Sequence, residues 1–279
     1  MSSADTPDLF DRIAAATAKA IRIAEITLPP DVLNRIVAAS ENETSPVARR
    51  ELMHILENIR LAEERQAPIC QDTGIPVVYL TLPPDIPYTP DITEAVRRGV
   101  REATKSIPLR PNLVDPISRH NTGTNTSADM PAVHVSAGDR LQVTVLPKGA
   151  GSENVSRLKM FTPTEKDRIP EFIVETALLA GGRPCPPIIL GVGIGGTFDG
   201  AASLAKEALL VPLDQMTPEE EDICRNVNDL GIGPMGLGGK TTCLGVKIKS
   251  AGCHTASLPV AVNIQCWAAR RATVEVPLS

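Results

Sequence analysis

Residues 67–74 read Ala-Pro-Ile-Cys-Gln-Asp-Thr-Gly and place a thiol, an amide and a carboxylate on three consecutive positions. Consecutive side chains do not share one face of a helix or a strand, so Cys70, Gln71 and Asp72 converge on one small object only in a tight loop. We interpret Cys70 as a ligand of a metal cluster, and Gln71 and Asp72 as groups that meet a small acidic substrate. The alternative is a buried cysteine followed by a turn that ends a helix, because cysteines are commonly small core residues.

The composition indicates which classes of partner and which cellular compartment to expect for this chain. It has 279 residues, of which 42% are hydrophobic and 3% aromatic, and its formal net charge is −5. This predicts one domain, residues 1–279, with an aliphatic core. It argues against nucleic acid as the main partner, since phosphate binding needs a basic surface. We find no apolar run of membrane-spanning length and no secretory signal, so we expect a cytoplasmic protein without a membrane partner.

The cysteines are expected to be thiols or metal ligands rather than disulfides in that compartment, and none of them forms a C-x-x-C pair. They are Cys70, Cys185, Cys224, Cys243, Cys253 and Cys266.

Hydrophobic periodicity places helices early in the chain and strands late. Residues 1–66 have helical periodicity, with Thr6 and Pro7 as an expected helix start, and strand patterns dominate from Thr241 onward. Residues 132–136 and 141–146 are expected to form a hairpin. These patterns predict an α+β (mixed α/β) fold, in which a helical N-terminal third packs around a mainly antiparallel or mixed sheet.

Two further polar loops resemble binding sites. Residues 119–126 carry Arg119, two amides and three hydroxyls, and an arginine grips a carboxylate with two parallel hydrogen bonds. The alternative is a solvated loop with local turns. Residues 148–154 form a glycine-containing loop whose backbone amides, at Gly151 among others, are able to approach an anion; the alternative is a simple turn. His254 lies in a polar turn between strands and is an acid–base candidate, because imidazole titrates near neutrality.

Residues 191–196 fit G-x-G-x-x-G between a strand and a helix, and Asp214 follows about 20 residues later. This spacing is typical of a dinucleotide site, so an NAD-dependent oxidoreductase is a rival interpretation. The glycines also suit close packing of a helix on a strand. Residues 233–241 resemble a phosphate-binding loop, but Pro234 occupies the position of its first glycine.

Five motifs in this order resemble the class I, iron–sulfur fumarate hydratases and the related L-tartrate dehydratases, over nearly the whole chain. They are residues 69–74, 121–126, 148–154, 185–187 and 233–236. The resemblance is to the α half of these enzymes, which pair it with a β half. It therefore implies the α subunit of a two-subunit enzyme, in an assembly of the α2β2 type, which hydrates fumarate reversibly to (S)-malate.

The resemblance also implies a cofactor and roles for individual residues. Cys70, Cys185 and Cys266 correspond to the three ligands of a [4Fe–4S] cluster. Three thiolates on four irons leave one iron open as a Lewis acid for a small dicarboxylate substrate. Gln71, Arg119 and Gly151 match substrate contacts, Asp72 matches a carboxylate that supports proton transfer, and His254 matches a histidine that we interpret as a proton carrier. Cys224 and Cys243 are expected in the core.

Three alternatives stay open at this point. L(+)-tartrate is the nearest alternative substrate, because small changes in the β half would accommodate an extra hydroxyl. The NAD-dependent oxidoreductase and a non-catalytic sensor that carries a cluster are more distant alternatives.

Overall fold

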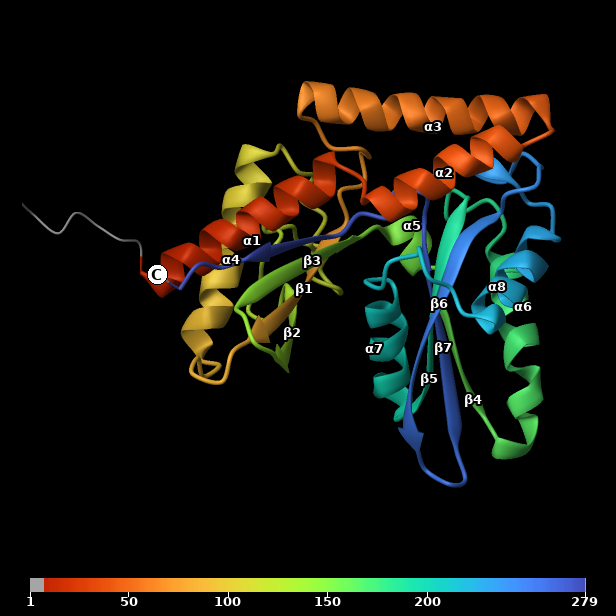
Figure 1. The fold of residues 1–279 in the computed structure, drawn as a ribbon. Helices are drawn as coiled ribbons and strands as arrows, with labels where there is room; N and C mark the ends of the chain where they lie inside the picture. The colour runs from red at the N-terminus through yellow and green to blue at the C-terminus, as the bar shows by residue number, and fades with distance from the viewer. Residues whose placement is uncertain (1–7, 279) are drawn as a thin grey trace, which may run out of the picture. The chain divides into compact units, whose positions relative to one another are not determined.

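The computed structural model describes residues 8–278, which form two compact units, each with its own four-stranded mixed sheet. The first unit takes the described residues up to Pro29, Leu61–Gly149 and the segment from Arg270, and the second takes Pro30–Arg60 and Ala150–Ala269. The predicted α+β class is confirmed, and the early residues are helical as expected (Figure 1). The expected helix start at Thr6 and Pro7 lies outside the described residues.

The helices and strands have the following bounds. The helices are α1 (Leu9–Ile26), α2 (Pro30–Asn42), α3 (Pro46–Arg65), α4 (Pro90–Ser106), α5 (Ala150–Glu153), α6 (Ile169–Ala180), α7 (Phe198–Ala208) and α8 (Pro218–Asn228), with short 3₁₀ segments at Pro163–Arg168 and Pro234–Gly236. The strands are β1 (Ile75–Leu82), β2 (Ala132–Ala137), β3 (Gln142–Lys148), β4 (Arg157–Phe161), β5 (Ile188–Gly196), β6 (Cys243–Cys253), β7 (Leu258–Gln265) and β8 (Ala272–Glu275). Within residues 8–278, no helix is both long and apolar enough to cross a membrane.

The first unit packs α1 and α4 together on a sheet of order β2-β1-β3-β8. Asp8 caps α1 by accepting the backbone N–H of Asp11, and a buried aliphatic stripe follows along the helix. The two helices approach closely because α4 carries Gly99, where an added Cβ would lie 2.4 Å from the carbonyl oxygen of Ala14. The resulting core is almost entirely aliphatic, as the composition predicts.

The hairpin predicted for residues 132–146 is wrong. The strands β2 and β3 are correctly located, but β1 lies between them, parallel to β2 and antiparallel to β3. The inserted β1 pairs Val77 with Ala132 on one side and with Leu146 on the other. Alternating apolar residues indicate a strand but not its neighbour, so a strand that is remote in sequence took the central place.

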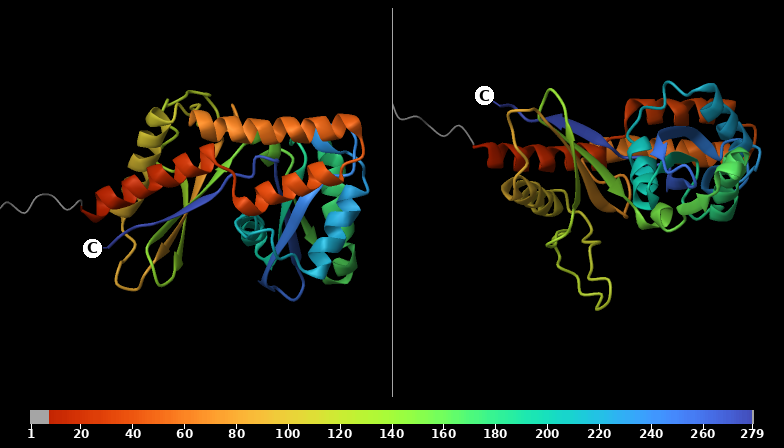
Figure 2. Two further views of the ribbon diagram at one scale, coloured as in Figure 1. Left: turned by 45° about the horizontal axis from the view of Figure 1, so that its top comes forward. Right: turned by 90° about the horizontal axis from the view of Figure 1, so that it is seen from below.

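The second unit has a sheet of order β4-β7-β5-β6, with α7 against one face and α6 and α8 packed into the core of the other (Figures 1 and 2). Helix α6 ends at Ala180, and Gly181 follows it with a positive φ of 58°. Thr217 and Glu220 form a capping box at the start of α8. Residues 148–154, expected as a loop, divide instead between the end of β3 and the short helix α5.

A buried ion pair joins α8 to β6 in this unit. Glu220 is 3% exposed, and it accepts Nζ of Lys247 at 2.8 Å and the backbone N–H of Ile248 at 2.8 Å. Burial acts to raise the pKa of Glu220, but the hydrogen bond from Lys247 and those from Thr217 and Ile248 outweigh it and hold the pKa below its ordinary value. The carboxylate is therefore the form that stabilises the fold.

Glu220→Gln is expected to lower the free energy of unfolding at neutral pH by about 1–3 kcal/mol, because Lys247 loses a charged, buried acceptor. Since the folded pKa is lowered, the contribution of Glu220 is present above the unfolded value of 4.5 and is lost as the pH falls through the folded pKa. Urea unfolding at neutral and acidic pH checks this, and the variant should lose less stability in acid than the unaltered chain. An equal loss for both proteins would contradict it.

Candidate active site

The loop of Cys70, Gln71 and Asp72 ends where β1 begins, and Gly74 closes it with a φ of +70°. The Oδ1 of Asp72 accepts the backbone N–H of Gly74 at 3.0 Å and the Nδ2 of Asn112 at 3.3 Å. The same Nδ2 donates to the carbonyl of Gly74 at 3.0 Å. Gln71 is exposed, whereas Cys70 and Asp72 are half-buried. The tight loop expected from the sequence is confirmed, and Asn112 fixes the orientation of its carboxylate.

The end of β3 lies against this loop. A Cβ added to Gly74 would sit 2.7 Å from the carbonyl carbon and oxygen of Lys148, and one added to Gly149 would sit 3.0 Å from Oδ2 of Asp72. Only glycine leaves room for this approach at Gly74, where φ is also positive. The first unit thus brings together two segments that the sequence singled out, residues 69–74 and 148–149.

The loop of residues 119–126 is anchored to the same region at one end. Asn125 is 1% exposed, and its Oδ1 accepts the backbone N–H of Asn112 at 2.7 Å and of Leu113 at 3.2 Å. Arg119 is exposed and has a φ of 59°, and the loop stands out from its unit (Figure 2, right). Asn125 therefore has a structural role, and Arg119 has the exposure that contact with a ligand requires.

The second unit brings Cys185 and Cys266 to neighbouring main-chain positions. The backbone N–H of Trp267 donates to the carbonyl of Cys185 at 3.3 Å, and that of Met235 donates to the carbonyl of Pro186 at 2.8 Å. Three motifs that are remote in sequence, residues 185–187, 233–236 and 264–267, therefore meet at one end of the sheet. Cys185 is exposed and has a φ of 54°, which is rare for a residue with a Cβ and is often found at functional sites.

Gly151 lies in α5, at the surface of the same unit. An added Cβ would sit 3.5 Å from the carbonyl oxygen of Arg183, which is an ordinary contact, so packing does not require glycine there. A glycine at an exposed position where a side chain would fit is consistent with close approach of a ligand to the backbone.

His254 lies at the other end of the sheet from Cys185 and Cys266. Cys253 pairs with Gly196 at the end of β5, whereas Gln265 pairs with Ile189 near its beginning. At about 3.3 Å per residue, the two ends are roughly 20–25 Å apart. His254 instead borders an open hollow of about 590 Å³, together with Cys253, Glu207 and the start of α7. The second unit does not bring His254 to Cys185 or Cys266.

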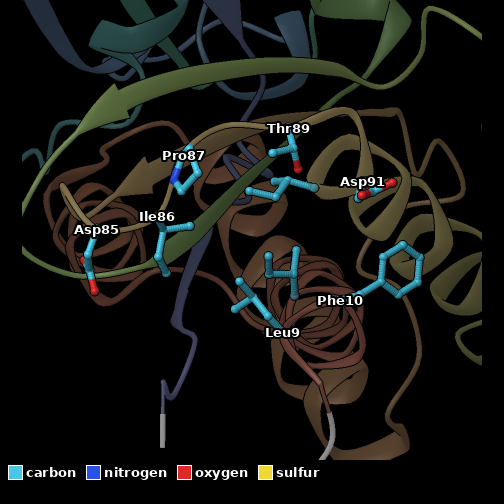
Figure 3. A pocket seen from close by; sticks show the side chains of 9 residues that line it. Leu9, Phe10, Asp85, Ile86, Pro87, Thr89 and Asp91 are labelled. Atoms are coloured by element: carbon cyan, nitrogen blue, oxygen red, sulfur yellow. The ribbon is translucent and has the colours of Figure 1, made fainter.

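A smaller hollow of about 310 Å³ lies in the first unit, between the start of α1 and the segment before α4 (Figure 3). Leu9, Phe10 and Ile86 give it apolar walls, and Asp85 and Asp91 lie at its sides. None of the residues predicted for the site lines it.

The remaining motifs have structural roles. Cys224 and Cys243 are buried as predicted, and burial raises the pKa of the Cys243 thiol well above its ordinary value. The glycines of 191–196 lie inside β5 rather than in a turn after it, and Gly191 and Gly193 face α7. In residues 233–241, the backbone N–H of Lys240 donates to Oε2 of the buried Glu43 at 2.8 Å. The packing of α7 accounts for Gly191 and Gly193 without a nucleotide.

The donor set fits an iron–sulfur cluster in its chemistry, because thiolates are the usual cluster ligands and all six cysteines are thiols. Cys70 belongs to the first unit, and Cys185 and Cys266 belong to the second. In the part of the chain that the structure describes, no three His, Cys, Asp or Glu side chains are gathered as for a single metal ion.

Sequence reasoning missed three residues that hold the Cys70 loop, namely Glu25, Asn112 and Arg270. Glu25 and Arg270 are each buried and 245 positions apart in sequence. The presence of charged residues at apolar positions of α1 and of the segment before β8 was the signal available in the sequence.

The family model for fumarate hydratase (Fumerase) matches residues 14–275 of this chain. The chain is 44% identical to the "Putative L(+)-tartrate dehydratase subunit alpha" of Methanocaldococcus jannaschii, over 96% of this chain and 98% of that protein. It is 30% identical to the L(+)-tartrate dehydratase subunit alpha of Escherichia coli, over 99% of this chain and 94% of that protein.

A third relative is the "Putative fumarate hydratase class I" of Geobacillus stearothermophilus, which is 36% identical over 89% of this chain. The match covers 52% of that longer protein, so the chain spans about half its length. The family match and these relatives agree with the resemblance of the five motifs. The chain therefore belongs to the fumarate hydratase family of hydro-lyases.

Proposed function

We propose that this chain is the α-type subunit of an iron–sulfur hydro-lyase that hydrates fumarate reversibly to (S)-malate and works with a β subunit. The observation that carries the proposal is the meeting of motifs within each unit: Asp72 with Gly149 in the first, and Cys185 with the backbone after Cys266 in the second. The relatives from Methanocaldococcus jannaschii and Escherichia coli, matched over 98% and 94% of their own length, are named α subunits, which supports a β partner. An assembly of the α2β2 type is part of the proposal.

The proposed cluster ligands are Cys70, Cys185 and Cys266, one from the first unit and two from the second. A bound [4Fe–4S] cluster with three protein ligands would supply an open iron, which polarises the hydroxyl and carboxylate of a hydroxy acid.

Other residues of the chain are proposed to bind and orient the substrate. We assign the carboxylates of the substrate to the guanidinium of Arg119, the amide of Gln71 and the backbone amide of Gly151. Addition of water to fumarate places extra negative charge on one carboxylate, and donors aimed at that charge lower the barrier. Asp72 is assigned to support proton transfer, because Gly74 and Asn112 hold its carboxylate in one orientation.

We assign the base itself to the β subunit. The proposal gives His254 no proton transfer beside Cys185 and Cys266 of its own chain, because it lies at the opposite end of the sheet from them.

L(+)-tartrate is the second candidate substrate, because the relatives from Methanocaldococcus jannaschii and Escherichia coli are named for it. The test is anaerobic reconstitution of the chain with iron and sulfide, alone and with its β partner, followed by assays with fumarate, (S)-malate and L(+)-tartrate. We expect turnover of fumarate only in the complex. Higher kcat/KM for tartrate would select the second candidate. Turnover by the chain alone, or a complex without iron, would contradict the proposal.

A further inference from the structure

The first unit contains a buried ion pair that contacts the Cys70 loop. Glu25, in the last turns of α1, and Arg270, before β8, each have a side chain that is 1% exposed, and Nη1 of Arg270 donates to Oε2 of Glu25 at 2.6 Å. Removing two charges from water costs several kcal/mol, and apolar residues of the same size often stabilise a core as well or better. Stability alone therefore does not account for a charged pair at this place.

The pair is attached to both ends of the loop. The backbone N–H of Ile69 donates to the carbonyl of Glu25 at 2.8 Å, and Nη2 of Arg270 donates to the carbonyl of Asp72 at 2.8 Å. Between these attachments lie Cys70 and Gln71, the residues that the proposed function assigns to the cluster and the substrate. The loop is thus fixed at its first and last residues while its middle stays accessible.

The planar fork of Arg270 makes this arrangement specific. One nitrogen is held by Glu25, which sets the plane of the guanidinium, and the other reaches the main chain at Asp72. A lysine has a single point of charge and does not bridge two fixed acceptors in this way. Burial raises the pKa of Glu25 to about 7, and the charge and hydrogen bond of Arg270 offset part of that rise, so Arg270 favours the charged form of Glu25.

We propose that Glu25 and Arg270 are positioning residues, which fix the main chain of residues 69–72 so that Cys70, Gln71 and Asp72 keep the orientation that the reaction needs. They act through the loop and do not touch the substrate. This inference rests on the proposed function for its effect on turnover, but its effect on the loop is independent of any activity.

The test compares Arg270→Lys with Lys247→Met, which breaks the buried pair with Glu220 in the second unit. In the apo chain, we measure amide hydrogen exchange of the peptide that covers residues 67–74 and the rate of alkylation at Cys70, with Cys253 as an exposed internal reference. For Arg270→Lys we expect the amide exchange of residues 67–74 and the alkylation of Cys70 each to become about 10- to 100-fold faster. This range corresponds to the loss of one charge-assisted hydrogen bond. Lys247→Met should lower Tm and leave both rates unchanged.

In the reconstituted complex, Arg270→Lys is expected to lower kcat about 10- to 100-fold with a smaller change in KM, because misplaced groups act mainly on the transition state. Glu25→Gln keeps an acceptor for Arg270 and should show a smaller effect in every assay, and it serves as the test if Arg270→Lys does not fold. A lower Tm with unchanged exchange and alkylation would overturn the inference. An inactive wild-type complex with the loop effects intact would instead overturn the proposed function alone.

Discussion

Cys266→Ala is expected to abolish iron binding and hydro-lyase activity, because a [4Fe–4S] cluster with three protein thiolates has no spare ligand. Cys266 follows β7 directly, and the next residue, Trp267, is hydrogen-bonded to the carbonyl of Cys185. Loss of its sulfur removes the thiol of one of the two cysteines whose main-chain segments meet in the second unit. Iron and sulfide content after anaerobic reconstitution, and turnover of the complex with the β subunit, measure the result.

Cys253→Ala is the matched control. Cys253 is exposed and ends β6, at the opposite end of the same sheet from Cys266. Cys253 and Cys266 are easily exchanged in a sequence alignment, because each lies at the end of one of the last two strands of the unit. The strand register places them at opposite ends of the sheet. The control should keep full iron content and activity. Retention of the cluster by Cys266→Ala, or its loss in Cys253→Ala, would refute the ligand assignment.

The parts of the fold that depend on local chemistry were predictable from the sequence. Helix 169–180 ends at a glycine, α8 begins with a threonine followed three residues later by a glutamate, and β5 is a buried apolar run. Each of these signals lies within a few residues of the feature it specifies. The pairing of β2 and β3 was not predictable in this way, because β1 lies between them and its registers are set by contacts 55 to 73 residues apart.

In the candidate site too, residues with a local sequence signal were predictable and residues that depend on long-range contacts were not. Cys70, Gln71 and Asp72 were recognisable because three reactive side chains in a row are unusual, and Cys185 and Cys266 through the resemblance to the family. The pairing of Glu25 with Arg270 was not recognisable, because the two residues lie 245 positions apart and a charge at an apolar position does not identify its partner. For His254, the residue type suited acid–base chemistry, but only the strand register shows that it lies far from Cys185 and Cys266.

Gly191→Ala is expected to lower the free energy of unfolding by about 3 kcal/mol or more, at the upper end for overpacking of a core. An added Cβ would lie 2.1 Å from the carbonyl oxygen of Ala205 and 2.8 Å from Cγ of Leu209, so α7 would have to move away from β5. For a protein of this size, that corresponds to a fall in Tm of roughly 6–12 °C. Thermal and urea unfolding of the apo chain measure it. Gly193→Ala should behave alike, because its Cβ would lie 2.1 Å from the carbonyl oxygen of Ala201.

The same substitution separates the hydro-lyase from the NAD-dependent alternative. Glycines that admit a pyrophosphate lie in the turn after a strand, and replacing them lowers nucleotide affinity more than stability. Gly252→Ala is the control, because an added Cβ there meets no atom within 4 Å, and its stability should stay within about 0.5 kcal/mol of the parent. Full stability of Gly191→Ala, together with protection of the parent chain against heat by NAD, would favour the nucleotide. A large loss at Gly191 and none at Gly252, without an effect of NAD, identifies the glycines of β5 as the surface on which α7 packs.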